Sequence, residues 1–284
     1  MMKEFIGRII TKRCFHKPIF ILGASRSGTS VLLQALGTHP LILAMPGEAP
    51  FITSMGGAVY LFEFAENRDY YLQSIKVTKD YLYNCFRRLS FEVAAGSNYG
   101  LKMIVKGILC GDLSLLWKRY WCAKTFPDHA VSKSLMQLYP KVKFVYIIRN
   151  GSNVVQSMTK FSGFRQQSFE KNCKSWAESV EKYRYLLALD SAIVVRHEQL
   201  VEDPDEIFQK IFSFIGIDYN EKPADFIKTV LVHPLDSSTK TGVDVKNVLN
   251  ARQPPYENWS SEQHDLFKNI CGNGMRELGY EIPF

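Results

Sequence analysis

The sequence lacks the cysteine patterns that mark zinc sites and disulfide-rich domains. Its six cysteines form no Cys-x-x-Cys pair, and no group of histidines and cysteines has the spacing of zinc ligands. We therefore expect reduced, mostly buried thiols, as in a cytosolic protein, and no metal site.

Long hydrophobic runs and long charged runs are also missing. No apolar run reaches the ~18 residues of a membrane-spanning helix, and residues 1–17 lack a signal peptide's apolar core, so we expect a cytoplasmic protein. The basic residues 1–17 are expected to form a short docking helix rather than a membrane-surface helix. Lysine and arginine outnumber the acids by 35 to 28 without forming one run. This excess suits an anionic ligand or surface, and the absence of one long basic run argues against a nucleic-acid-binding tail.

The chain does contain the alternation of an α/β protein. Apolar runs alternate with helical stretches over 284 residues without repeats, which predicts a parallel sheet in a single domain, 1–284. Strands are expected at 18–22, 101–105, 120–123, 143–148 and 192–195. Long helices are expected at 70–89, 169–189, 204–214 and 261–278.

Two segments between these elements have their own character. Residues 51–120 are predicted to be a helical insertion rich in aromatic side chains, which at helical spacing form core or line an acceptor pocket. Residues 233–259 show little periodicity and are expected to form a long functional loop. The aromatic residues of the insertion are Phe51, Tyr60, Phe62, Phe64, Tyr70, Tyr71, Tyr81 and Tyr83.

The stretch PIFILGASRSGTSVLLQAL, residues 18–36, predicts a strand, a glycine turn and a helix. It matches the phosphate-loop pattern G-x-x-x-x-G-K-[ST], except that Thr29 replaces the lysine. Backbone N–H groups in such a turn, together with the start of the helix, bind an anion. The sequence has neither the lysine that reaches a γ-phosphate nor a convincing Walker-B aspartate, which argues against ATP hydrolysis.

A second anion site is expected after the strand KFVYII, residues 143–148. Arg149 follows this strand, at the edge where ligands of open α/β sheets bind. Its guanidinium can present a fork to a phosphate, and Ser157 follows about two turns along the next helix. The two sites together suggest two phosphate subsites for one nucleotide.

Five segments between residues 18 and 217 resemble, in the expected order, sulfotransferases that use 3′-phosphoadenylyl sulfate. The resemblance is closest to the tyrosylprotein sulfotransferase-like branch. The five segments are PIFILGASRSGTS at 18–30, THP with GE at 38–48, WCAKTFP at 121–127, FVYIIRNGSNVVQSM at 144–158, and VRHEQLVEDPDEIFQKIFSFIGI at 195–217.

The resemblance implies both a fold and a donor. The fold is a three-layer α/β fold of P-loop type, with a central parallel sheet flanked by helices and a helical insertion on the acceptor side. The donor carries a 5′-phosphosulfate and a separate 3′-phosphate, so it needs two anion sites and no metal. By match to the family, Arg149 and Ser157 bind the 3′-phosphate. The residues matched to the 5′ end are Arg26, Ser27, Gly28, Thr29 and Ser30.

The chain also departs from the family pattern. Asn150 replaces an aspartate and Ser152 an arginine, which puts further 3′-phosphate contacts from this turn in doubt. Phe126 intervenes before the proline of the K-[TD]-P segment. His197 replaces the tyrosine of the Y-E-x-L segment, which we expect to be chiefly structural.

Sulfuryl transfer needs a base near the acceptor and cations near the transferring group. Glu48, at the GE position, is the expected base, and Lys124 with Arg26 is expected to neutralise charge on the sulfuryl group. Weaker base candidates are His39, Glu63 and His129. Lys102 and Lys106 are candidates for attracting an anionic acceptor, and Lys240, Lys246 or Arg252 for folding over the nucleotide.

The predicted function is metal-independent transfer of a sulfuryl group to a hydroxyl by in-line displacement. The alternatives are a P-loop nucleotide kinase and a non-catalytic nucleotide-binding homologue. Protein tyrosine, a carbohydrate, a lipid headgroup and a small natural product stay open as acceptors, and no nucleic-acid partner is expected.

Overall fold

The described part of the chain contains a five-stranded sheet. The computed structural model describes residues 16–95, 117–164, 166–232, 255–282 and 284. The strand order is β2-β3-β1-β4-β5, and β3 pairs in parallel with both β1 and β2. The strands are β1 (Pro18–Leu22), β2 (Ile42–Glu48), β3 (Tyr120–Lys124), β4 (Lys143–Ile148) and β5 (Ala192–Arg196). The expected α/β fold with a central parallel sheet is confirmed.

Four predicted strands are present and one observed strand was not predicted. Every residue of β1 is buried, as expected for a parallel strand covered on both faces. Strand β2 was missed because Pro46 and Gly47 interrupt its apolar run, and the pairing with β3 is irregular there. The strand predicted at 101–105 lies outside the described residues.

The chain forms two compact units. The first unit consists of Met1–Ile21 and Leu36–Phe144, and the second unit consists of Leu22–Ala35 and Val145–Phe284. In the first unit, α3 (Pro50–Glu63) packs on α5 (Lys79–Ala95) and α7 (His129–Leu138). The buried rings of Phe20 in β1, Trp121 in β3 and Tyr139 meet edge to face. The prediction of one domain over the whole chain stays a prediction.

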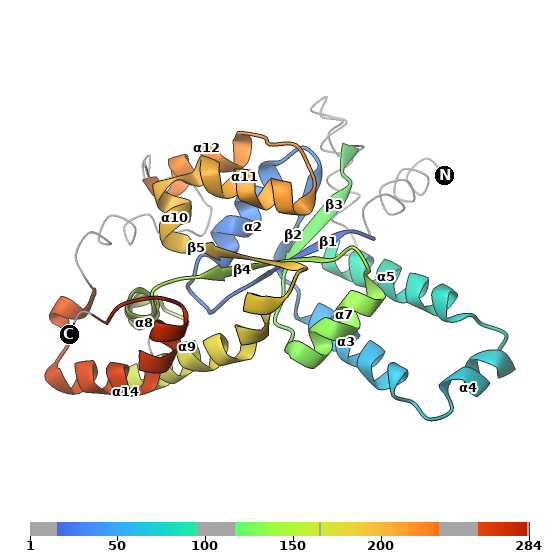
Figure 1. Cartoon of the computed structure of the whole chain (residues 1–284), viewed down its shortest axis with the longest axis horizontal. Helices are drawn as coiled ribbons and strands as arrows, with labels where there is room; N and C mark the ends of the chain where they lie inside the picture. Colours follow the sequence, from blue (N-terminus) through green and yellow to red (C-terminus); the bar gives the residue numbers. More distant parts are fainter. Residues whose placement is uncertain (1–15, 96–116, 165, 233–254, 283) are drawn as a thin grey trace. The chain divides into compact units, whose positions relative to one another are not determined.

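In the second unit, helices cover both faces of β4 and β5. Figure 1 shows α10, α11 and α12 on one side and α8, α9 and α14 on the other. Trp176 of α9 packs closely against Gly151 and Gly274, which joins α8, α9 and α14. The helices are α2 (Thr29–Thr38), α8 (Gly151–Lys160), α9 (Phe169–Tyr183), α10 (His197–Glu202), α11 (Pro204–Ile215), α12 (Lys222–Ile227) and α14 (Ser261–Glu277). No helix in the described ranges is both long and apolar enough to cross a bilayer.

Two predicted helices end or break earlier than expected. The helix predicted at 70–89 is two helices, α4 (Arg68–Ser74) and α5, and Lys76 between them has a positive φ of 55°. The helix predicted at 169–189 ends at Tyr183 and continues as a 3₁₀ turn, Arg184–Ala188. Propensity alone did not reveal either break, because both depend on local backbone geometry.

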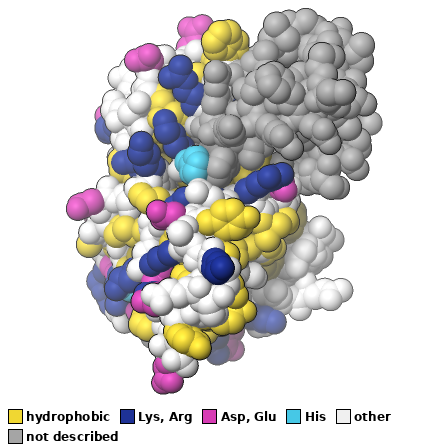
Figure 2. Space-filling model, turned by 90° about the vertical axis from the view of Figure 1, so that its right-hand side faces the viewer, with side chains coloured by type: hydrophobic (Ala, Val, Ile, Leu, Met, Phe, Trp, Pro, Cys, Tyr) yellow, Lys and Arg dark blue, Asp and Glu magenta, His cyan; other side chains and the backbone are white. Residues whose placement is uncertain are grey.

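Most aromatic residues of the helical insertion lie at the surface. Tyr83 is buried, but Phe64 is 71% exposed and Tyr70 76% exposed, so the core interpretation is wrong for these two. Figure 2 shows hydrophobic side chains exposed beside lysine and arginine side chains on the face at the right of Figure 1. The exposed large hydrophobic residues of α3 to α5 also include Tyr60, Leu61, Tyr71, Ile75, Tyr81, Leu89 and Val93.

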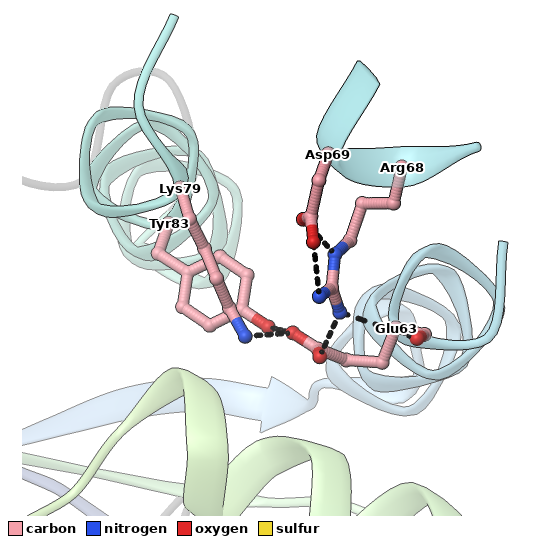
Figure 3. Close-up of polar contacts among 5 residues, drawn as sticks. All are labelled: Glu63, Arg68, Asp69, Lys79 and Tyr83. Carbon is pink, nitrogen blue, oxygen red and sulfur yellow. Dashed lines mark hydrogen bonds and ion pairs between the residues drawn. The ribbon is translucent and has the colours of Figure 1, made fainter. Parts of the chain in front are cut away.

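A single carboxylate joins α3, α4 and α5, the helices in the described part of this insertion (Figure 3). Glu63, at the end of α3, pairs with Arg68 of α4 at 2.7 Å and with Lys79 of α5 at 2.6 Å. The same carboxylate accepts a hydrogen bond from the hydroxyl of Tyr83. Glu63 therefore has a structural role here, and its carboxylate oxygens are already engaged by cations and a hydroxyl.

We expect Glu63→Ala to lower the free energy of unfolding by about 1–3 kcal/mol, because Lys79 and Tyr83 lose this partner and Arg68 keeps only its ion pair with Asp69. Urea denaturation would measure the loss. Glu92→Ala is the matched control, since its ion pair with Arg88 on α5 is exposed on both sides and should contribute less than about 0.5 kcal/mol. Equal losses in the two variants would contradict this role for Glu63.

Candidate active site

The turn between β1 and α2 is packed so closely that glycine is required at two positions. A Cβ atom at Gly23 would lie 2.5 Å from the carbonyl oxygen of Ile147 in β4. Gly28 has a φ of +98°, and a Cβ atom there would lie 2.6 Å from the His197 ring. Steric contacts thus explain why both positions of the phosphate-loop pattern are glycine. The turn lies directly against β4 and α10.

Arg26 adopts a left-handed backbone conformation inside this turn, with a φ of 69°. Such a φ is uncommon outside glycine and is often found where a site is held in a strained geometry. The Nε atom of Arg26 donates to Oγ of Ser157 at 3.2 Å, and its guanidinium lies 4.2 Å from the centre of the Phe161 ring. Arg26 therefore reaches α8, on the side of the predicted 3′-phosphate site.

The two predicted anion sites adjoin one another in the second unit. Arg149 follows β4, and its Nη1 donates to the carbonyl oxygen of Arg26 at 2.9 Å. The structure thus brings Arg26 together with Arg149 and Ser157, which follow it in the sequence by 123 and 131 residues. Ser27, Gly28, Thr29 and Ser30 lie in the same turn or at the start of α2.

The departures from the family pattern in this segment have a local explanation. Oδ1 of Asn150 accepts hydrogen bonds from the backbone N–H of Ser152 at 3.0 Å and from its hydroxyl at 2.7 Å. Asn150 is therefore the N-cap of α8, a role that asparagine and aspartate fill equally well. Ser152 is buried and completes this cap. Both side chains are uncharged and serve the helix start, so they do not replace the positive charge of the family's second arginine.

Two residues of the second unit were not predicted as part of the site. His197 packs on Gly28, and Glu198 accepts a hydrogen bond from the backbone N–H of Asn150 at 2.9 Å. Both lie at the junction of β5 and α10, in the segment expected to be chiefly structural. One hint was visible in the sequence, since a histidine replaces the family's tyrosine directly before the glutamate.

The His197 imidazole is neutral in the folded protein. Burial lowers its pKa to about 3, and the nearby Arg149 guanidinium contributes to this lowering. In the unfolded chain a histidine has an ordinary pKa of about 6.5 and binds a proton below that pH. The unfolded state therefore takes up more protons than the folded state between about pH 6.5 and about 3.

It follows that stability falls as the pH falls below about 6.5. Between pH 7 and pH 5 the contribution of His197 is expected to decrease by up to about 1–2 kcal/mol. Urea denaturation at both pH values would measure the loss. His197→Tyr retains a ring against Gly28 but does not titrate in this range, so its stability should depend less on pH. Identical pH dependence in the two proteins would exclude His197 as the source.

In the first unit, Glu48 and Lys124 form an ion pair at 2.8 Å. Their placement depends on β2, where Gly47 has a φ of +67° and the pairing with β3 resumes at Glu48 opposite Lys124. The Glu48 side chain is 56% exposed, whereas that of Lys124 is only 12% exposed. The pair thus presents a solvent-accessible carboxylate backed by a mostly buried ammonium group.

Thr125 connects this pair to the start of α3. Its hydroxyl donates to the carbonyl oxygen of Ala49 at 3.3 Å and lies 3.2 Å from the hydroxyl of Thr53. The backbone N–H of Ala49 donates to the carbonyl oxygen of Lys124 at 2.8 Å, and that of Phe126 donates to Oγ1 of Thr53 at 3.3 Å. The inserted Phe126 is thus accommodated by this hydrogen-bond network around Glu48 and Lys124.

The remaining candidates are less suited to catalysis or cannot be placed. His39 is buried and its Nδ1 accepts a hydrogen bond from the backbone N–H of Leu41, which is a packing and capping role. His129 is the first residue of α7. Lys102, Lys106, Lys240, Lys246 and Arg252 lie outside the described residues. Within the described ranges, no three His, Cys, Asp or Glu side chains are grouped as metal ligands.

Each unit therefore offers a different chemical capability. In the second unit, two guanidinium groups, a hydroxyl and the start of α2 surround one small region, which suits an anion with two phosphoryl groups. In the first unit, the Glu48 carboxylate can accept a proton from a hydroxyl beside the Lys124 cation.

The chain is similar to known proteins both in sequence and in structure. A sequence model of the Sulfotransferase family matches residues 18–221. The chain is 23% identical over 210 residues to the protein-tyrosine sulfotransferase of Drosophila melanogaster, covering 72% of this chain and 38% of that protein. It is 26% identical over 212 residues to protein-tyrosine sulfotransferase 1 of Danio rerio, covering 72% and 54%. The chain thus spans about a third to half the length of these relatives.

Solved structures show the same fold at low sequence identity. Mouse sulfotransferase SULT7A1 complexed with PAP is similar with a TM-score of 0.52 and 14% identity, covering 96% of this chain and 90% of that one. The sulfotransferase domain of the Synechococcus PCC 7002 olefin synthase gives a TM-score of 0.51 and 17% identity, covering 94% and 96%.

Proposed function

Because the chain belongs to the sulfotransferase family, we propose that it transfers a sulfuryl group from 3′-phosphoadenylyl sulfate to a hydroxyl acceptor. The observation that carries this proposal is the hydrogen bond from Arg149 to the backbone of Arg26, which joins the two anion sites. A donor with charge at both its 5′ and 3′ ends needs two such sites side by side.

The donor supplies the sulfuryl group, and the second unit supplies its binding residues. Arg149 and Ser157 are proposed to bind the 3′-phosphate of the donor. The turn from Gly23 to Ser30 is proposed to bind its 5′-phosphosulfate. The side chain of Arg26 contacts Ser157, so we propose that it serves the 3′ side as well as the 5′ side. Its guanidinium can share hydrogen bonds between both anions because it has five N–H donors.

The first unit is proposed to supply the acid–base chemistry. Glu48 takes the proton of the acceptor hydroxyl as the new oxygen–sulfur bond forms. The bond between sulfur and the bridging phosphate oxygen breaks, and adenosine 3′,5′-bisphosphate leaves with the electron pair. Lys124 stabilises negative charge next to Glu48 during this displacement.

Protein tyrosine is the first acceptor to test, because two relatives are named protein-tyrosine sulfotransferases. Carbohydrates, lipid headgroups and small natural products form the comparison set.

Calorimetry with adenosine 3′,5′-bisphosphate, without added metal, tests the donor site. We expect saturable binding of the bisphosphate and no comparable binding of ATP with magnesium. Binding of ATP–magnesium alone would favour a nucleotide kinase. An acceptor screen with labelled donor then tests transfer, and bisphosphate binding without transfer to any acceptor would favour a non-catalytic homologue.

A further inference from the structure

The junction of β5 and α10 contacts the backbone of the proposed 3′-phosphate site through Glu198. Glu198 is the second residue of α10, and both of its carboxylate oxygens are engaged. Oε1 accepts from the backbone N–H of Asn150 at 2.9 Å, and Oε2 accepts from the hydroxyl of Tyr280 at 2.9 Å. One side chain thus connects the end of β4 with the C-terminal segment.

The hydrogen bond to Asn150 matters because this residue directly follows Arg149. Asn150 also caps α8, the helix that carries Ser157. Fixing the N–H of Asn150 therefore fixes the backbone between the proposed phosphate-binding arginine and the helix that provides the hydroxyl. A carboxylate near the start of a helix is itself favourable, because it faces the positive end of the helix dipole.

Glu198 also places a negative charge close enough to Arg149 to affect its pKa. Burial lowers the pKa of Arg149, Glu198 raises it, and Arg26 lowers it. The carboxylate thus offsets part of the repulsion between the guanidinium groups of Arg149 and Arg26. These two residues are joined by the hydrogen bond from Arg149 to the carbonyl oxygen of Arg26.

Tyr280 holds Glu198 in turn. Its ring lies 4.7 Å from the guanidinium of Arg196, and Arg196 donates to the carbonyl oxygen of Leu278 at 2.6 Å. Burial and the Glu198 carboxylate raise the pKa of Tyr280, so the phenol keeps its proton and donates to Glu198.

We propose that Glu198 is a positioning residue for the 3′-phosphate of the donor, acting through the backbone N–H of Asn150 with Tyr280 as its outer support. This inference rests on the proposed function. If it is correct, loss of Glu198 weakens the affinity for a ligand with a 3′-phosphate more than the affinity for a ligand that has only the 5′ group.

The test compares adenosine 3′,5′-bisphosphate with adenosine 5′-phosphosulfate, which lacks the 3′-phosphate. Glu198→Ala should weaken bisphosphate binding about 10-fold or more, and 5′-phosphosulfate binding less than about 3-fold. Glu198→Gln keeps an oxygen acceptor for Asn150 and should stay within about 3-fold of the wild type. Tyr280→Phe should show an intermediate loss of about 2- to 5-fold.

The control is Glu202→Ala, an exposed glutamate at the end of the same helix, which should bind both ligands as the wild type does. In turnover assays, the donor KM of Glu198→Ala should rise with little change in kcat. Equal weakening of both ligands, unchanged bisphosphate binding, or a glutamine variant as weak as the alanine variant would each overturn the inference. A wild-type protein that binds no bisphosphate would instead refute the proposed function itself.

Discussion

Replacing Arg149 with alanine is expected to weaken binding of adenosine 3′,5′-bisphosphate by about 100-fold or more, because truncation of a half-buried charged partner costs about 2–5 kcal/mol. Arg149 follows β4 and donates one hydrogen bond to the carbonyl oxygen of Arg26, which holds its guanidinium against the glycine turn. Calorimetry with the bisphosphate would measure the loss directly.

Two further variants make this result specific. Arg149→Lys keeps the charge but loses the planar fork, so we expect a smaller loss of about 10-fold. Arg276→Ala removes an exposed arginine on α14 of the same unit and should leave the affinity unchanged. If the lysine variant bound as tightly as the wild type, charge alone would account for binding. If Arg149→Ala bound the bisphosphate as tightly as the wild type, Arg149 would lie outside the donor site.

The second large effect concerns turnover rather than binding. Glu48→Gln should lower kcat by about 10²- to 10⁴-fold, because the amide cannot take the proton of the acceptor hydroxyl. Affinity for the bisphosphate should not change, since the proposed donor residues are Arg26, Arg149, Ser157 and the glycine turn. Single-turnover assays with labelled donor would separate these two quantities.

The control for Glu48 is Glu66→Gln, an exposed glutamate of the first unit. It should retain the wild-type kcat, because Glu66 lies in the turn after α3 and not beside Lys124. Unchanged turnover in Glu48→Gln would remove this residue from the mechanism and leave its ion pair with Lys124 as a structural contact.

Much of the fold was predictable because it depends on local pattern. Strands of a parallel sheet appear as short apolar runs, and four of the five strands in the described residues were located in this way. The glycine turn was recognisable for a similar reason, since Gly23 and Gly28 meet steric limits that no other residue satisfies. Strand β2 was missed because proline and glycine at 46 and 47 usually end a strand, whereas here they form an irregularity that places Glu48 opposite Lys124.

The sequence alone determined which residue types were available to bind two anions: a lysine-free glycine turn, an arginine after a buried strand, and a serine two turns later. Only the tertiary structure decided which of them touch. Arg26 reaches Ser157 because its backbone has a positive φ, and Glu198 reaches Asn150 because β5 ends beside β4. Contacts between residues so far apart in the chain arise from strand order and backbone conformation, which leave no periodic pattern in the sequence.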